Sequence, residues 1–397
     1  MHDADAPEAG LAPARRAVSV CFFVNGAIIA SWLPHIPDLK ARLDLDDGGL
    51  GLLLLAMAAG AIAALPPAGW LVARAGSRAV IAASASALSA AVIPPALAPG
   101  IVSSAAALAL LGACNATLDV AMNAHGVTVE ERYRRPIMSS FHAFFSLGGL
   151  VGAALAGAAM AVGLSAAAHV AAVAALSLAA VCVATRRLLP TTRTRRDGSP
   201  IFVAPPRALL GLGLLTFCAL LAEGAMGDWS AVYLRDYLGT MPSTAAMGFA
   251  AFSLAMALGR FSGDRLARRL GPRRLLQLSA TLAASGLALS LLARGPIIVV
   301  LGFAVVGLGA ANLIPVLFRA AGRVDNIPAG TAIAAVATSG YFGFLAGPPL
   351  IGFAARMAGL PFALGLVCAA CALVAVGAAG TFTATDRPTA SSPPRRT

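Results

Sequence analysis

Polar side chains suited to binding a proton or a solute follow one face of a strongly apolar segment. Asn115, Asp119 and Asn123 are spaced four residues apart in a run made almost entirely of Ala, Leu and Gly. Residues four apart stack on the same face of an α-helix, so these three side chains should line one surface. An acid at the centre of a membrane helix costs about 2.5–3.5 kcal/mol, and it is therefore expected to face water or a partner. This pattern makes Asp119 the first candidate for a group that binds and releases a proton.

Each candidate has a structural alternative. For Asp119 that alternative is a helix cap, or a pair that holds two helices together, and the basic residues available for such a pair are Arg132, Arg134 and His142. Glu223, near the middle of a later apolar segment, is the second candidate acid, for either substrate binding or proton transfer. His142 lies at a depth similar to that of Asp119 and is its candidate partner, with a purely structural histidine as the alternative. The remaining candidates for the wall of a polar cavity are Asn25, Asn312, Thr338, Ser339 and Tyr341.

Four other polar or aromatic residues are assigned to the membrane surface. Asp228 is expected near the outer interface as a solvated acid, and His125 is expected at the membrane surface. Trp32 and Trp229 fall at the outer ends of two apolar segments, where tryptophan commonly anchors a protein in the interface. Stacking against a sugar ring is the alternative for both tryptophans.

The composition decides which elements carry these residues. Hydrophobic residues make up 59% of the 397 and charged residues only 12%, about half the charged fraction of a soluble domain. A bilayer core needs about 20 apolar residues per helix, and windows of this length recur along the chain. The first window is too long for a secretory signal and is expected to remain as a membrane helix. The sequence therefore predicts an all-α membrane protein with twelve transmembrane helices, at 17–37, 48–72, 79–98, 101–125, 137–162, 165–185, 208–233, 244–262, 275–293, 296–318, 331–355 and 361–382.

The positive charges are distributed unevenly over the predicted loops. The net charge of +12 would suggest a nucleic-acid partner in a soluble protein. If the N-terminus is cytoplasmic, however, all but five of the 29 Lys and Arg residues lie on the cytoplasmic side. The five exceptions are Lys40, Arg42, Arg235, Arg294 and Arg356. This distribution follows the positive-inside rule, so the expected partner is the lipid bilayer and not nucleic acid.

The sequence lacks the signatures of several other functions. All six cysteines fall inside predicted helices, so neither a disulfide framework nor a metal site is predicted, and no cofactor is implied. The patterns H-E-x-x-H and G-x-S-x-G, which would suggest an enzyme, are not found. A non-transporting sensor or scaffold is a further alternative, but the segments outside the predicted helices are too short to fold alone.

The chain divides into two similar halves. The segment 186–207 is polar, basic and proline-containing, and it separates six predicted helices from six. "LVARAGSR" at 71–78 resembles "LARRLGPR" at 266–273 at an offset of 195 residues, and "GACN" at 112–115 resembles "GAAN" at 309–312 at an offset of 197. Glycines also match at the offset of 195: Gly148, Gly152 and Gly157 with Gly343, Gly347 and Gly352. These matches predict a duplicated six-helix unit. The predicted parts are a cytoplasmic tail at 1–16, a half at 17–185, a linker at 186–207, a half at 208–382 and a cytoplasmic tail at 383–397.

These features resemble the major facilitator superfamily over nearly the whole chain. The loop signature of that family, G-x-x-x-D-R-x-G-x-R, is matched between the second and third predicted helices, with Ala73 in place of the acid, and in part between the eighth and ninth. The matching gate residues are Gly69, Arg74, Gly76 and Arg78 in the first copy and Gly263, Asp264, Arg265, Arg269, Gly271 and Arg273 in the second. "AEGAMGDWSAVYLRD" and "DVAMNAHGVTVEERYRRPIMSSFHAFFSLGG" look like the YbjJ-type bacterial inner-membrane carriers, a branch near the fucose permeases.

The resemblance implies a monomeric, multi-pass carrier in the bacterial inner membrane, with both termini cytoplasmic and with helices 1, 4, 7 and 10 around a central cavity. Those helices hold the polar candidates Asn25, Asp119, Glu223 and Asn312. The fucose permeases use acids in helices 1 and 4, whereas helix 1 of this chain offers Asn25 instead. We therefore predict alternating access with proton-coupled uptake of a small polar, sugar-like solute. The alternative within transporters is proton-driven efflux of amphipathic compounds or drugs.

Overall fold

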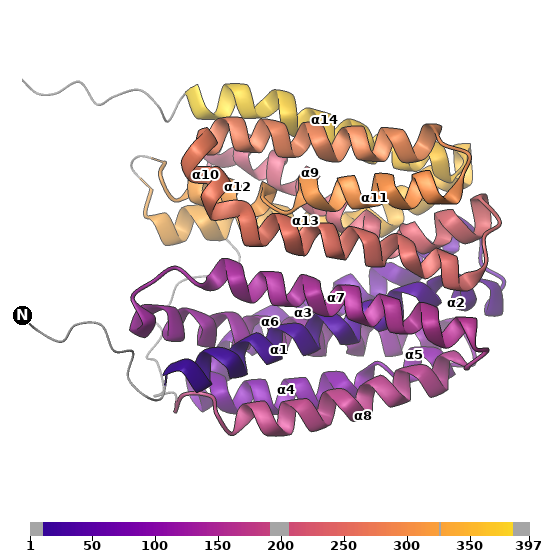
Figure 1. Cartoon of the computed structure of the whole chain (residues 1–397), viewed down its shortest axis with the longest axis horizontal. Helices are drawn as coiled ribbons and strands as arrows, with labels where there is room; N and C mark the ends of the chain where they lie inside the picture. The colour runs from indigo at the N-terminus through magenta and orange to yellow at the C-terminus, as the bar shows by residue number, and fades with distance from the viewer. Residues whose placement is uncertain (1–10, 191–205, 325–326, 384–397) are drawn as a thin grey trace, which may run out of the picture.

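All of the described elements are helices. The computed structural model describes residues 11–190, 206–324 and 327–383. Figure 1 shows long helices running side by side, with the N-terminal half of the chain in one layer and the C-terminal half in the other. The N-terminal half contains α1 (Leu11–Trp32), η1 (Leu33–His35), α2 (Ile36–Arg42), α3 (Asp47–Ala75), α4 (Ser77–Ala91), α5 (Pro94–Leu97), α6 (Ile101–Tyr133), α7 (Met138–Ala161) and α8 (Ala166–Thr185). The C-terminal half contains η2 (Arg207–Leu209), α9 (Leu210–Val232), η3 (Tyr233–Tyr237), α10 (Pro242–Leu292), α11 (Pro296–Ala310), α12 (Leu313–Ala321), α13 (Ala329–Ala358) and α14 (Leu360–Thr383).

Twelve helical segments in the described chain are long and apolar enough to cross a membrane. They overlap all twelve predicted windows, which confirms the predicted all-α fold class. α6 is longer than predicted and runs to Tyr133, because neither Gly nor Pro interrupts its last two turns; it ends where Arg134 adopts a left-handed conformation with φ 52°. The predicted tails at 1–16 and 383–397 and the linker at 186–207 lie largely outside the described residues.

Both copies of the loop signature form the same turn. Gly76 ends α3 with φ 84° and ψ 149°, and Gly271 interrupts α10 with φ 74° and ψ 161°. Residues with a side chain rarely adopt this conformation. The two glycines are 195 residues apart, so both halves reverse direction with the same backbone conformation at the same point of the repeat.

Gly271→Ala is expected to lower the free energy of unfolding by about 1–3 kcal/mol, the usual cost of holding a non-glycine residue in this conformation. No atom lies within 4 Å of the place where the alanine Cβ would stand, so the loss comes from backbone strain and not from a clash. Gly295→Ala is the matched control, because Gly295 is equally open and has φ −98°. Thermal unfolding of the two variants measures the difference. Equal stability would contradict the strain argument.

The packing of helices repeats as well. α7 approaches α1 so closely that a Cβ on Gly148 would lie 2.0 Å from the carbonyl oxygen of Phe23. In the other half, α13 approaches α9, and a Cβ on Gly343 would lie 2.5 Å from the carbonyl oxygen of Phe217. Small residues allow membrane helices this close approach. The glycine match seen in the sequence therefore marks the same helix contact in both halves.

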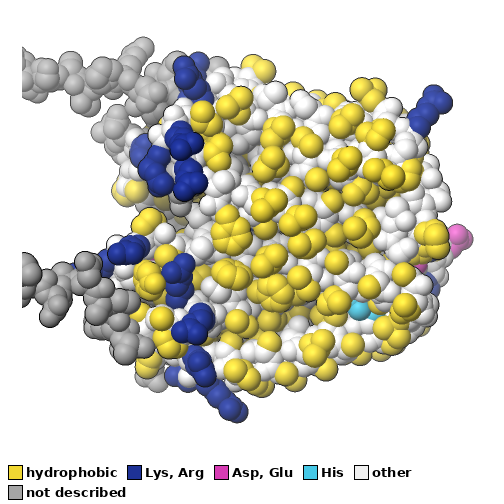
Figure 2. All heavy atoms as spheres, viewed as in Figure 1, with side chains coloured by type: hydrophobic (Ala, Val, Ile, Leu, Met, Phe, Trp, Pro, Cys, Tyr) yellow, Lys and Arg dark blue, Asp and Glu magenta, His cyan; other side chains and the backbone are white. Residues whose placement is uncertain are grey.

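The two ends of the bundle differ in charge. Figure 2 shows Lys and Arg side chains gathered at one end on both halves, at the left, and hydrophobic side chains over the band beside it. We call this the arginine end; its residues include Arg74 of α3, Arg132 of α6 and Arg319 of α12. The other, which we call the opposite end, is where α1 and α9 finish and α3 begins.

The halves meet along two pairs of helices, α7 with α10 and α3 with α13. In the first pair, a Cβ on Gly157 would lie 3.2 Å from Cβ of Ala246, and in the second, a Cβ on Gly51 would lie 3.1 Å from Cα of Gly352. Both contacts lie toward the opposite end. α6 packs mainly on α1, α3 and α4, and α12 mainly on α9, α10 and α13, so each of these helices stays with its own half.

Candidate functional site

Asp119 lies about halfway along α6 and is hydrogen-bonded within its own helix. Asn123, one turn later, donates from Nδ2 to Asp119 Oδ1 over 3.0 Å and to the Asp119 carbonyl oxygen over 2.9 Å. The four-residue spacing thus brings these two side chains together, as the sequence predicts. Across the parts of the chain that the structure describes, no basic side chain forms an ion pair with Asp119. The pairing of Asp119 with Arg132, Arg134 or His142, considered above, is therefore wrong for this structure.

A residue of the other half approaches Asp119. Tyr341 of α13 packs on the apolar cluster around Ala116, one turn before Asp119 on α6. The same cluster includes Val120, the residue after Asp119, so this part of α6 lies near Tyr341. A movement of one half against the other would therefore change the surroundings of Asp119.

Two amides on the same side of the N-terminal half keep unused hydrogen-bonding capacity. Asn115 Oδ1 and Asn25 Oδ1 are both buried and have no partner among the described residues. Asn25 Nδ2 lies 3.9 Å from Met122 Sδ, which places this residue of α1 against α6. A polar solute or water would satisfy these oxygens by donating hydrogen bonds.

Arg260 of α10 joins three helices at the boundary between the halves. Its Nη2 lies 3.4 Å from Glu223 Oε1 of α9, in the same half. Its Nη1 donates to Ser146 Oγ over 2.7 Å and to the His142 carbonyl oxygen over 3.4 Å, both in α7 of the other half. The side chains of Arg260 and Glu223 are 13% and 20% exposed. We call these four residues the bridging cluster.

Sequence reasoning missed Arg260 as a site residue. It was counted among the positive charges of the cytoplasmic side, although it falls inside the predicted helix 244–262. A basic residue within a membrane span is itself a signal of a buried partner, and Glu223 in the adjacent helix is that partner. The His142 ring packs edge-on against Phe22 at a centroid distance of 5.2 Å, so only its backbone takes part in the cluster.

Two other candidates lie apart from these groups. Asn312 stands at the break between α11 and α12, and its Oδ1 lies 2.2 Å from the place where a Cβ on Gly263 would stand. A larger residue at position 263 would therefore collide with Asn312. Asp228 lies near the end of α9 and is half-buried.

The gate residues of the first copy lie at the arginine end. The Arg74 guanidinium stacks over the Trp70 ring at 5.2 Å, and Arg78 donates to the Arg186 carbonyl oxygen over 3.4 Å. In the second copy, Arg265, Arg269 and Arg273 are exposed. The Asp264 side chain lies outside the described part of the structure. The arginines of both copies thus lie along helix ends and not beside Asp119 or Glu223.

Two predictions about the membrane surface are wrong. Trp32 and Trp229 are 1% and 0% exposed, and therefore cannot anchor the protein in the interface. His125 is also fully buried, but its partners lie at the start of α4 and beyond the end of α8: its Nε2 accepts from the Leu189 N–H over 3.2 Å, so its Nδ1 carries the proton and donates to Ser77 Oγ over 2.9 Å. Each of these residues is covered by neighbouring helices that the sequence alone did not place.

In residues 11–190, 206–324 and 327–383, no group of three or more His, Cys, Asp or Glu is arranged to hold a metal ion. The polar groups described above are amides, carboxylates, hydroxyls and the Arg260 guanidinium, which suit hydrogen bonding to a solute and proton exchange.

Comparison with known proteins identifies the family. The family model of the Major Facilitator Superfamily matches residues 18–222 and 212–397. The chain belongs to this superfamily. Its relatives include an uncharacterized MFS-type transporter of Yersinia pestis, 39% identical over 90% of this chain and 93% of the relative, and membrane protein MosC of Rhizobium meliloti, 33% identical over 90% and 88%. As a transporter of this superfamily, the protein is not an enzyme.

Solved structures share the fold of this superfamily transporter. A variant of the nucleoside transporter NupG matches with a TM-score of 0.73 at 13% identity, covering 93% of this chain and 99% of NupG. A bacterial homologue of the human lysosomal transporter Spinster, in an inward-facing and occupied conformation, matches at 0.71 and 15% identity, over 94% and 97%. The transporter FucP in its outward conformation matches at 0.61 and 18% identity, over 92% and 98%.

Proposed function

We propose that this transporter carries a small polar solute across the bacterial inner membrane in symport with a proton, by alternating access. Asp119 carries the proton, and the solute binds between Asp119 and the bridging cluster. The substrate class is an uncharged, hydroxyl-rich molecule such as a sugar. The protein acts as a monomer.

The observation that carries the proposal is the hydrogen bonding of Asp119. The Asp119 side chain accepts a hydrogen bond from the amide of Asn123. An amide can hydrogen-bond to a carboxyl group in either its charged or its protonated state. Glu223, by contrast, already has a cationic partner, the guanidinium of Arg260 at 3.4 Å. We therefore assign the transported proton to Asp119 and a structural ion pair to Glu223.

The orientation of the protein in the membrane follows from the position of the arginine end. Positive residues gather on the cytoplasmic side of membrane proteins, so we assign the arginine end to the cytoplasm and both termini with it. The solved structures that support a polar solute are those of the nucleoside transporter NupG and of FucP, the fucose:proton symporter of E. coli. They share only the fold with this chain, so the assignment rests on its own polar residues.

Purified protein in liposomes tests the proposal directly. A panel of sugars, polyols, organic acids and cationic drugs is added outside, and proton movement is followed with an internal pH dye. We expect at least one neutral, hydroxyl-rich solute to drive protons inward with it. Proton release in exchange for a cationic drug would favour the efflux alternative, and proton flux with none of the compounds would contradict coupling to these solutes.

A further inference from the structure

Three ion pairs join the halves at the opposite end. Asp38 pairs with Arg235, Lys40 Nζ lies 2.7 Å from Asp236 Oδ2, and Arg356 Nε lies 3.2 Å from Asp46 Oδ2. We call these pairs the ion-pair latch. In each pair one residue belongs to the N-terminal half and the other to the C-terminal half. A contact of this kind forms only while the two halves are close together at this end.

The latch is made from equivalent extensions of two helices. α1 continues through η1 into α2, which carries Asp38, and α9 continues into η3, which carries Arg235. Positions 38 and 235 are 197 residues apart, the same offset that relates "GACN" to "GAAN". The duplicated unit therefore holds an acid at this position in one half and a base in the other. Equal charges would repel across the boundary between the halves, whereas these charges attract.

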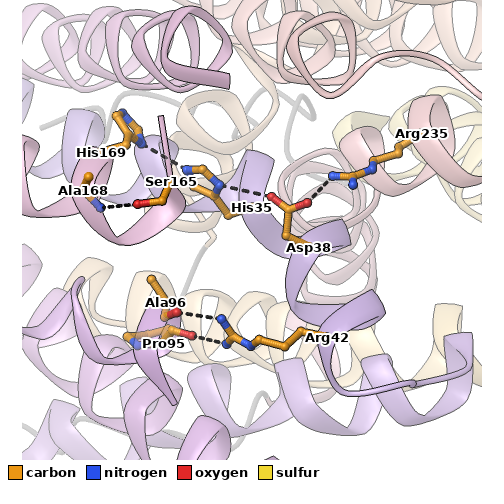
Figure 3. Close-up of polar contacts among 9 residues, drawn as sticks. All are labelled: His35, Asp38, Arg42, Pro95, Ala96, Ser165, Ala168, His169 and Arg235. Atoms are coloured by element: carbon orange, nitrogen blue, oxygen red, sulfur yellow. Dashed lines mark hydrogen bonds and ion pairs between the residues drawn. The ribbon is translucent and has the colours of Figure 1, made fainter. Parts of the chain in front are cut away.

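Asp38 is held in position by buried histidines. Its Oδ2 lies 3.4 Å from His35 Nδ1, and His35 Nε2 lies 3.0 Å from His169 Nδ1 of α8 (Figure 3). When neutral His35 donates from Nδ1 to the carboxylate, its Nε2 accepts from His169 Nδ1–H. Because His35 is only 2% exposed, this chain of hydrogen bonds ties Asp38 to the packed interior of the N-terminal half.

We propose that the ion-pair latch holds the opposite end closed and so sets the fraction of molecules that are open toward the arginine end. The inference rests on the alternating access in the proposed function, and not on the solute or on proton coupling. All three pairs are partly solvated, with Asp38 40% and Arg235 28% exposed. Losing one such pair should shift the conformational equilibrium about two- to fivefold toward opening of this end.

Thiol labelling measures opening at this end without any transport assay. Ala246 is fully buried near the start of α10, where it faces Gly157 of α7 across the boundary between the halves. In the full-length protein, Ala246→Cys reports opening through its rate of reaction with a membrane-impermeant maleimide. Peptide mass spectrometry assigns the label to position 246, so the native cysteines can remain.

The variants to compare are Asp38→Asn, Arg235→Gln and both together. Each single variant is expected to raise the labelling rate about two- to fivefold, and the double variant no further, because one broken pair is the shared cause. Arg42→Gln is the matched control. Arg42 lies in the same α2 but donates to the carbonyl oxygens of Pro95 and Ala96 in its own half, as Figure 3 shows, and its loss should leave the rate unchanged.

Unchanged labelling in the Arg235→Gln variant would overturn the proposal, because Arg235 is exposed enough to be replaced without harm to folding. An equal rise with Arg42→Gln would also overturn it, since general loosening would then explain the effect. If Asp38→Asn fails to fold, Arg235→Gln and an Asp236→Asn variant decide the matter on their own, because Asp236 pairs with Lys40 across the boundary whereas Lys40 also pairs with Asp47 in its own half. None of these outcomes depends on whether a solute moves protons.

Discussion

Asp119→Asn is expected to abolish solute-driven proton flux while the protein still folds. Asparagine keeps the shape of the side chain, and its amide oxygen still accepts the hydrogen bond from Asn123 Nδ2 that Asp119 Oδ1 accepts now. It cannot bind or release a proton in the accessible range of pH. The variant should therefore lose proton movement and keep the exchange of labelled solute across the liposome membrane. Both are measured in the same reconstituted preparation.

The matched control for this substitution is Asp228→Asn. Asp228 is also an acid of intermediate exposure in a membrane-spanning helix, but it lies on α9, four residues before that helix ends, and the proposed function gives it no part in coupling. Its substitution should leave proton flux close to that of the wild type. Proton flux that persists in Asp119→Asn would show that Asp119 is a structural residue, and Glu223 would become the next candidate for the proton carrier. Loss of solute exchange together with proton flux would indicate damage to the binding site instead of to coupling.

The helices were predictable because every apolar residue of a long window adds to the evidence for a membrane span. Each membrane span needs only a long apolar window, and the twelve windows appear in the structure. The turns at Gly76 and Gly271 were also within reach, since glycine at matching places of a repeat points to a backbone conformation that other residues avoid. The pairing of Asn123 with Asp119 follows from local helix geometry in the same way.

The contacts between distant helices were not predictable in this way. Arg260 meets Glu223, 37 residues away, and Ser146, 114 residues away, and no local pattern relates these positions. Several spans are apolar on all sides, so the sequence does not show which face turns inward. This explains why the sequence assigns Trp32 and Trp229 to the membrane interface although both are buried.

The Glu223 and Arg260 pair gives the second large expected effect. Glu223→Gln or Arg260→Gln alone should destabilise the protein by about 3–5 kcal/mol, because each leaves a charge without its partner in a mostly buried site. The double variant removes both charges and should be more stable than either single variant, because neither charge is left without its partner. Thermal unfolding in detergent measures the three variants. Arg356→Gln is the control: it breaks a pair whose side chains are 65% and 52% exposed, and it should cost at most about 1 kcal/mol.

The double variant also separates stability from transport. Arg260 donates to Ser146 of the other half, so it connects Glu223 to the boundary that must open and close during alternating access. If the pair only stabilises the fold, the more stable double variant should transport better than either single variant. We expect instead that transport stays lost while stability returns, because glutamine at position 260 has no positive charge with which to link α9 to Ser146 of the other half. Recovery of transport with stability would assign the bridging cluster to folding alone.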